Sequence, residues 1–154
     1  MRKSLFILFF SLVVVSMFLT LQYFGVTSVG FRIDFQTIRK GTWGGRDSGY
    51  YVIQNTEQWN EICKRVFPPD AVPEINFSNT TVIAVFMGLQ PTAGYAIEVK
   101  EITDTIFRVV VKVAWITPGG KMVLHVFTSP YHIIKTQKIN KPVTFQTIWE
   151  THDC

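Results

Sequence analysis

The chain has 154 residues, which is enough for one domain and an additional segment. Its 15 lysines and arginines outnumber its 11 acidic residues, and the net charge at pH 7 is +4. The basic residues form no stripe with interleaved aromatic side chains, so this pattern argues against a nucleic-acid partner.

The first segment is a hydrophobic run that we do not expect to belong to the globular fold. Arg2 and Lys3 precede a predominantly apolar stretch, residues 5–26, and the next charged residue is Arg32. The stretch is longer than the ~7–15 residues of a secretory apolar region and close to the ~20 that span a bilayer. We therefore expect residues 1–28 to be an uncleaved signal anchor, forming one transmembrane helix, or a cleaved signal peptide. The rest of the chain would then lie outside the cytoplasm, anchored to the membrane or secreted.

Residues 29–45 are expected to form a spacer and a first strand. Phe31, Ile33 and Phe35 alternate with charged residues, which is the period of a half-buried strand. A glycine-rich turn follows and reaches Gly49, and a short strand is predicted over residues 50–53.

A helix is predicted after Asn55, which can act as the N-cap with Gln58 three positions later. One apolar face is formed by Trp59, Ile62, Cys63 and Val66. Two consecutive prolines, Pro68 and Pro69, end the helix.

Cysteine usage permits one disulfide. The chain has two cysteines, Cys63 and Cys154, and an even number outside the cytoplasm is compatible with a pair. The alternative is that Cys63 is an unpaired, buried apolar residue, since it falls on the apolar face of the predicted helix.

Strands dominate the remainder of the chain. Residues 80–87 are apolar without alternation, which predicts a strand covered on both faces. Further strands are predicted over residues 95–99, 107–115, 122–128 and 143–149, with a turn at 116–121. Residues 46–154 are thus expected to form a mainly β domain with one α-helix (α+β). Its architecture would be a β-sandwich or an open barrel of about 7–8 strands.

The sequence contains no set of residues typical of an enzyme. It has no zinc-protease, thiol-redox or serine-hydrolase motif and no close pair of carboxylates. His125 alternates with apolar residues in a predicted strand, and the tail His152–Cys154 is too short a donor set for a firm metal site. We therefore expect no catalytic residue, no metal and no cofactor.

Two asparagines, Asn76 and Asn79, match the N-glycosylation acceptor pattern. Both fall in a predicted loop outside the cytoplasm, which is the context that the modification requires. They are candidate glycosylation sites.

Three loops follow successive strands, at Gln90–Tyr95, Thr117–Gly120 and Thr128–His132. Ordinary strand connections would explain all three, and we favour that explanation for the second. In the first and third, a tyrosine accompanies a proline, and tyrosine supplies rigid contact area at low entropic cost. The candidate binding residues are Pro91, Thr92, Gly94, Tyr95, Thr128, Ser129, Pro130 and Tyr131.

At these loops the chain resembles the PrcB C-terminal domain family, named for a subunit of a cell-surface protease complex. The similarity runs from about Arg46 to Lys135. Its most specific parts are Phe86–Gly88, Pro91–Tyr95 and Thr128–Tyr131. Members often have Gly where Ala93 stands and Asp where Asn76 stands. The resemblance implies a membrane-tethered, non-catalytic domain that associates with or stabilises a secreted protease.

A looser likeness is confined to the loops. Chagasin-type inhibitors of cysteine peptidases are sandwiches with an Asn-Pro-Thr-Thr-Gly-Tyr loop, which residues 90–95 resemble with Gln90 in place of Asn. The Arg-Pro-Trp element of those inhibitors is missing. The likeness implies a peptidase inhibitor as an alternative function, and a structural envelope protein is a second alternative.

Overall fold

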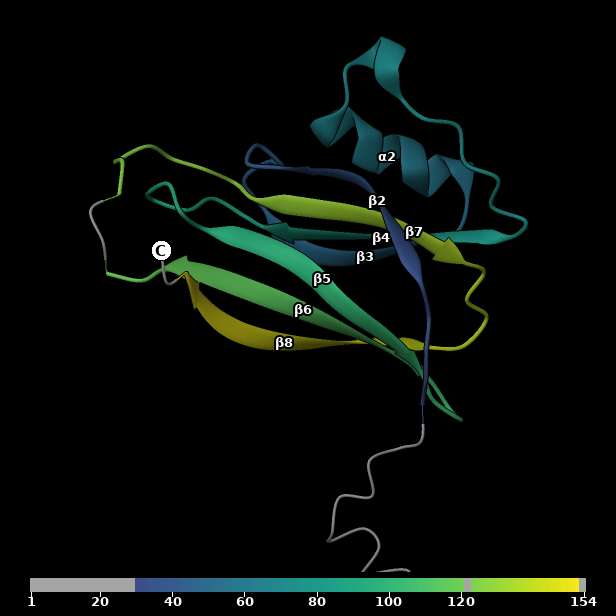
Figure 1. Ribbon diagram of the computed structural model, residues 1–154. Helices are drawn as coiled ribbons and strands as arrows, with labels where there is room; N and C mark the ends of the chain where they lie inside the picture. The colour runs from purple at the N-terminus through teal and green to yellow at the C-terminus, as the bar shows by residue number, and fades with distance from the viewer. Residues whose placement is uncertain (1–29, 121–122, 153–154) are drawn as a thin grey trace, which may run out of the picture.

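The computed structural model describes residues 30–120 and 123–152, which form two four-stranded sheets and one α-helix (Figure 1). The predicted sandwich is therefore confirmed, and the barrel is not formed. The elements are β1 (Phe31–Arg32), β2 (Phe35–Gly41), β3 (Ser48–Ile53), α2 (Thr56–Val66), the short 3₁₀ helix η1 (Pro69–Ala71), β4 (Thr80–Met87), β5 (Ala96–Asp104), β6 (Val109–Pro118), β7 (Tyr131–Gln137) and β8 (Val143–His152).

The predicted signal segment, residues 1–28, lies outside the described residues. Within the part of the chain that is described, no helix has the length and hydrophobicity needed to cross a bilayer.

The two sheets have the strand orders β1-β5-β6-β8 and β2-β7-β4-β3. All neighbouring strands are antiparallel except β6 and β8, which run parallel from Val109↔Val143 to Pro118↔His152. Helix α2 covers the outer face of the second sheet (Figure 1). The domain thus has three layers, in the order helix, sheet, sheet.

Strand β4 is the central element, since it is buried on both faces as its apolar sequence predicts. Val82, Ala84 and Phe86 face α2, where they join Trp59, Ile62 and Cys63 in one apolar cluster. The alternate residues Ile83, Val85 and Met87 face the other sheet and pack with residues of β5 and β6, including Val99, Val111 and Val113. Every residue from Thr81 to Met87 is at most 2% exposed.

Helix α2 forms where its capping residues predict. The Asn55 carboxamide oxygen accepts a hydrogen bond from the Gln58 backbone N–H at 2.9 Å, and the Gln58 side chain accepts one from the Gln54 N–H. Trp59 is 2% exposed, and its indole N–H donates to the Pro73 carbonyl at 3.0 Å. The indole therefore packs the helix against the sheet and also links it to the following loop.

The first predicted strand is wrong in one respect, because it is split between the two sheets. Phe31 pairs with Asp104 of β5, whereas Phe35 pairs with Thr136 of β7. Ile33, between them, is buried in the core that separates the sheets. The chain thus crosses from one sheet to the other within three residues, which an alternating pattern does not reveal.

A β-bulge in β5 changes which residues face the core. Val99 pairs with Val113 and Glu101 with Lys112, so Lys100 has no partner in the pairing. The buried positions accordingly shift from Ile97 and Val99 to Ile102.

Two assignments near the C-terminal half are corrected by the structure. The strand predicted over residues 122–128 is absent from its described part, residues 123–128, and Val123–Phe127 is an irregular segment in which His125 is exposed. The strand lies instead at Tyr131–Gln137, where β7 occupies the sheet between β2 and β4. Phe107, predicted to begin a strand, lies in the β5–β6 turn, and β6 begins at Val109.

Both ring nitrogens of His132 in β7 form hydrogen bonds, one to β5 of the opposite sheet and one to β2 of its own sheet. Its Nδ1 accepts from the Val99 backbone N–H at 3.0 Å, and its Nε2 lies 2.9 Å from the Thr37 hydroxyl. Because Nδ1 is an acceptor, the neutral ring carries its proton on Nε2 and donates it to Thr37. Burial lowers the pKa of His132 from its ordinary 6.5 to about 4, with a further lowering from Lys40 that Glu98 opposes.

We expect Trp59→Ala to destabilise the domain by about 3–5 kcal/mol, because it leaves a cavity between α2 and β4 and removes the bond to Pro73. The matched control is Trp149→Ala, whose side chain is 70% exposed and which should cost less than about 1 kcal/mol. Urea unfolding of both variants measures the difference. Equal losses would contradict the packing described for α2.

The native state should lose stability as the pH falls below 6.5, because the unfolded chain protonates His132 more readily than the folded chain does. A fall in pKa from 6.5 to about 4 corresponds to a loss of about 2 kcal/mol between pH 7 and pH 5. This part of the stability is present above pH 6.5 and disappears as the pH approaches 4.

The measurement is urea unfolding at pH 7 and pH 5 of the native chain, His132→Asn and the exposed-site control His125→Asn. We expect His132→Asn to be less stable at pH 7 but to lose much less on acidification. A pH dependence equal to that of the native chain would exclude His132 as its source.

Candidate functional site

The three loops predicted from the sequence converge at one end of the sandwich. Gln90 and Thr128 exchange two backbone hydrogen bonds, at 2.7 and 3.0 Å, and the Thr128 hydroxyl donates to the Thr92 carbonyl at 3.0 Å. Gly94 lies against Pro118, at the end of β6. We call this region the loop end; it comprises residues 41–47, 88–95, 117–120 and 123–130. In Figure 1 it lies on the left, on the side where β8 ends.

The first loop has both exposed and structural residues. Pro91 and Gly94 are exposed, while Thr92 and Tyr95 are half-buried, and Tyr95 packs against the core between the sheets. Gly94 has a φ of +89°, and a β-carbon there would lie 2.8 Å from the β-carbon of Pro118. Its lack of a side chain is therefore required by the backbone and by close contact with β6.

The third loop does not form the exposed surface that we predicted. Thr128, Ser129, Pro130 and Tyr131 are all buried. Ser129 exchanges backbone hydrogen bonds with Thr42 and Gly44 at 2.7 Å. The Tyr131 ring stacks on Phe86 at a centroid distance of 5.9 Å, and its hydroxyl accepts from Arg39 Nε at 3.0 Å. As folded, these residues hold the loop end together and offer little surface to a partner.

Large apolar side chains that the sequence pattern did not single out are exposed at the loop end instead. They are Trp43, Leu89, Leu124, Val126 and Phe127, which we call the apolar loop-end cluster. Leu124 is 75% exposed and Phe127 60%. Their backbones are neighbours: Trp43 bridges to Ser129, the Ala93 N–H donates to the Leu124 carbonyl, and Leu89 precedes the Gln90–Thr128 pair. Such grouping is typical of interaction sites.

A groove between β2 and the C-terminal end of α2 adjoins Trp43. Four basic residues line it, Arg39, Lys40, Lys64 and Arg65, and its lining contains no acidic residue. Arg39 lies 4.7 Å above the Phe67 ring and Arg65 lies 4.1 Å above the Phe86 ring. These cation–π contacts fix two guanidinium groups beside the apolar loop-end cluster.

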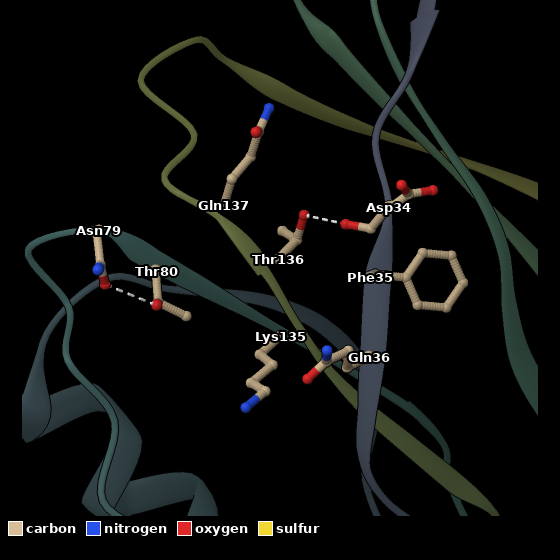
Figure 2. A pocket seen from close by; sticks show the side chains of 8 residues that line it. All are labelled: Asp34, Phe35, Gln36, Asn79, Thr80, Lys135, Thr136 and Gln137. Atoms are coloured by element: carbon tan, nitrogen blue, oxygen red, sulfur yellow. Dashed lines mark hydrogen bonds between the residues drawn. The ribbon is translucent and has the colours of Figure 1, made fainter.

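A second hollow lies where β2 begins and β7 ends, and its lining is polar (Figure 2). The Thr136 hydroxyl donates to the Asp34 carbonyl at 2.8 Å, and the Thr80 hydroxyl donates to the Asn79 side chain at 3.0 Å. Figure 2 shows the Phe35 ring turned away from Asn79 and Thr80. The hollow is lined by neither a histidine nor a cysteine, and we assign no reactive site to it.

The remaining predicted residues fall as follows. Asn76 and Asn79 are exposed in the loop before β4, and their glycosylation stays a prediction.

Cys63 is buried, and burial raises the pKa of its thiol to about 11. Its proposed partner, Cys154, lies outside the described residues, so the disulfide also stays a prediction. Across residues 30–120 and 123–152, no three His, Cys, Asp or Glu side chains are grouped so as to hold a metal ion.

Comparisons with known proteins bear on the segment that carries the loops. The model of the family described as PrcB C-terminal matches residues 81–137, which run from β4 to the end of β7. Searches of curated proteins and of solved structures found no match. The predicted resemblance is therefore confirmed over residues 81–137, which carry the sequence pattern of the PrcB C-terminal family, whereas the match does not extend to residues 46–80.

Proposed function

We propose that the chain is a non-enzymatic, extracytoplasmic domain, tethered to the membrane through residues 5–26, whose loop end binds a secreted or cell-surface protease. The family match supports association with a protease complex. The observation that carries the proposal is the apolar loop-end cluster, because large side chains that a folded domain leaves exposed together are typical of a contact surface.

The surface chemistry of the loop end defines the partner that it suits. Trp43, Leu124 and Phe127 offer aromatic and aliphatic area for the dry centre of an interface. The neighbouring groove contributes basic residues, with Arg39 and Arg65 fixed over aromatic rings. A partner with an apolar patch bordered by carboxylates would complement both features.

A peptidase inhibitor is the second candidate, and one observation favours it. Residues 90–95, which resemble a chagasin-type loop, converge with the two other loops, since Gln90 pairs with Thr128 and Gly94 touches Pro118. However, an inhibitor of that kind inserts exposed loops into a groove, whereas Thr128–Tyr131 is buried. We therefore rank inhibition below binding outside the active site of a protease. A purely structural envelope role would not explain why the apolar loop-end cluster is exposed, so we rank it last.

The test is the double variant Leu124→Ser/Phe127→Ser in the full-length chain, extracted from membranes with detergent and purified with its partners. We expect recovery of the protease partner to fall at least about tenfold, since hot-spot side chains each contribute more than ~1 kcal/mol to binding. Because both side chains are exposed, the melting temperature should change little.

Phe107→Ser is the matched control, because Phe107 is 83% exposed but lies at the other end of β6. It should retain the partner in detergent extracts. Recovery of the same proteins in the same amounts with all three chains would refute binding through the loop end. Titration against papain-like and subtilisin-like enzymes separates the two candidates: inhibition at micromolar concentration would favour the inhibitor.

A further inference from the structure

The turn between β5 and β6 presents two large apolar residues to solvent. Ile106 is 76% exposed and Phe107 is 83% exposed. Two-residue hairpin turns usually carry Asn-Gly or similar pairs, which suit both water and the backbone. Here the turn is closed by the residues on either side. The Thr105 N–H and hydroxyl donate to the Arg108 carbonyl at 2.9 and 2.6 Å, and the Arg108 N–H donates to the Thr105 hydroxyl at 3.3 Å.

A third exposed apolar residue lies beside this turn. Phe31 is 78% exposed and pairs with Asp104, the last residue of β5. Gly30 lies against Thr103 and Asp104, so the described chain begins at the same place. We call this region the hairpin end; it comprises residues 30–32, 104–109 and 140–142. In Figure 1 the purple start of the described chain lies near the β5–β6 turn at the lower right, away from the loop end.

Cationic side chains accompany these apolar residues. Arg32 and Arg108 are exposed beside Phe31 and Phe107. Lys141 donates to the Thr105 carbonyl at 2.9 Å and forms an ion pair with Asp104. Exposed apolar side chains flanked by basic ones are the combination that inserts into a lipid–water interface with anionic headgroups.

Covalent geometry limits how far this end can lie from the apolar segment. The segment ends at Val26, four residues before Gly30. A fully extended chain advances at most ~3.6 Å per residue, so Gly30 lies within about 14 Å of Val26 whatever the intervening conformation. The polar layer of one leaflet is about 5–8 Å thick. If residues 5–26 are embedded in a bilayer, the hairpin end is therefore held close to its surface.

We propose that the hairpin end docks on the phospholipid surface, with Phe31, Ile106 and Phe107 entering the interfacial layer and Arg32, Arg108 and Lys141 near lipid phosphates. This inference rests on the tethering in the proposed function. Because the loop end lies at the opposite pole of the sandwich, docking would turn the apolar loop-end cluster away from the membrane and toward a partner.

The experiment uses the full-length chain in vesicles of phosphatidylcholine and phosphatidylglycerol. Single cysteines at Phe107→Cys, or at Ile106→Cys as a second site, are labelled with an environment-sensitive fluorophore in a Cys154→Ser background. Cys63 is buried and does not compete for the label. The matched control is Leu124→Cys, which is 75% exposed at the loop end.

We expect the labels at 106 and 107 to be quenched by spin-labelled lipids and to show at least about threefold weaker quenching by aqueous iodide than the label at 124, as interfacial insertion requires. Equal iodide access at 106, 107 and 124 in vesicle-bound protein would overturn the docking while leaving the tether intact. Flotation of the same samples tests the tether. A chain that does not float with the vesicles would overturn both the tether and the docking.

Discussion

The burial of β4 on both faces is the constraint on which the rest of the structure depends. A strand in which every residue from Thr81 to Met87 is sealed from water needs a covering layer on each side. The sheet β1-β5-β6-β8 supplies one layer, and α2 supplies the other. A helix as short as α2 would not persist alone in water, so its position is maintained by Trp59 and its apolar neighbours against the sheet.

This layering leaves the two ends of the sandwich as the places where apolar residues meet solvent. At the loop end, buried residues such as Ser129 and Tyr131 brace the segments on which Trp43 and Phe127 are exposed. At the hairpin end, the hydrogen bonds between Thr105 and Arg108 close a turn whose tip residues, Ile106 and Phe107, are not typical of a two-residue turn. Both exposed groups thus stand on backbones fixed by hydrogen bonds, and binding would require little ordering of the chain.

The sequence predicted the elements whose pattern is local. The capped amphipathic helix, the uninterrupted apolar strand β4 and the alternation of Val109, Val111 and Val113 all appear in the structure. It did not predict β7, because Tyr131 and His132 resemble a polar loop in the sequence. The partners that allow His132 to be buried, the Val99 N–H and the Thr37 hydroxyl, come from distant strands.

The sequence predicted where the candidate site lies but not which of its residues are exposed. Periodicity does not distinguish an apolar residue that packs in the core from one that remains exposed, so the segment containing Leu124 and Phe127 resembled a strand. Conversely, Tyr131 in a proline-containing loop resembled a contact residue and is 4% exposed. The convergence of the loops could not be predicted from local pattern either, because it depends on pairing between Gln90 and Thr128.

The parallel pairing of β6 with β8 has a consequence for the order of folding. β8 follows β7, a strand of the opposite sheet, so β6 keeps an unpaired edge from Val109 to Pro118 until residues 143–152 have been synthesised and have crossed over. Phe145 and Val143 then close the core between the sheets. An unpaired strand edge is a template for pairing with another chain, so this edge of β6 is open to strand exchange between copies until β8 is added.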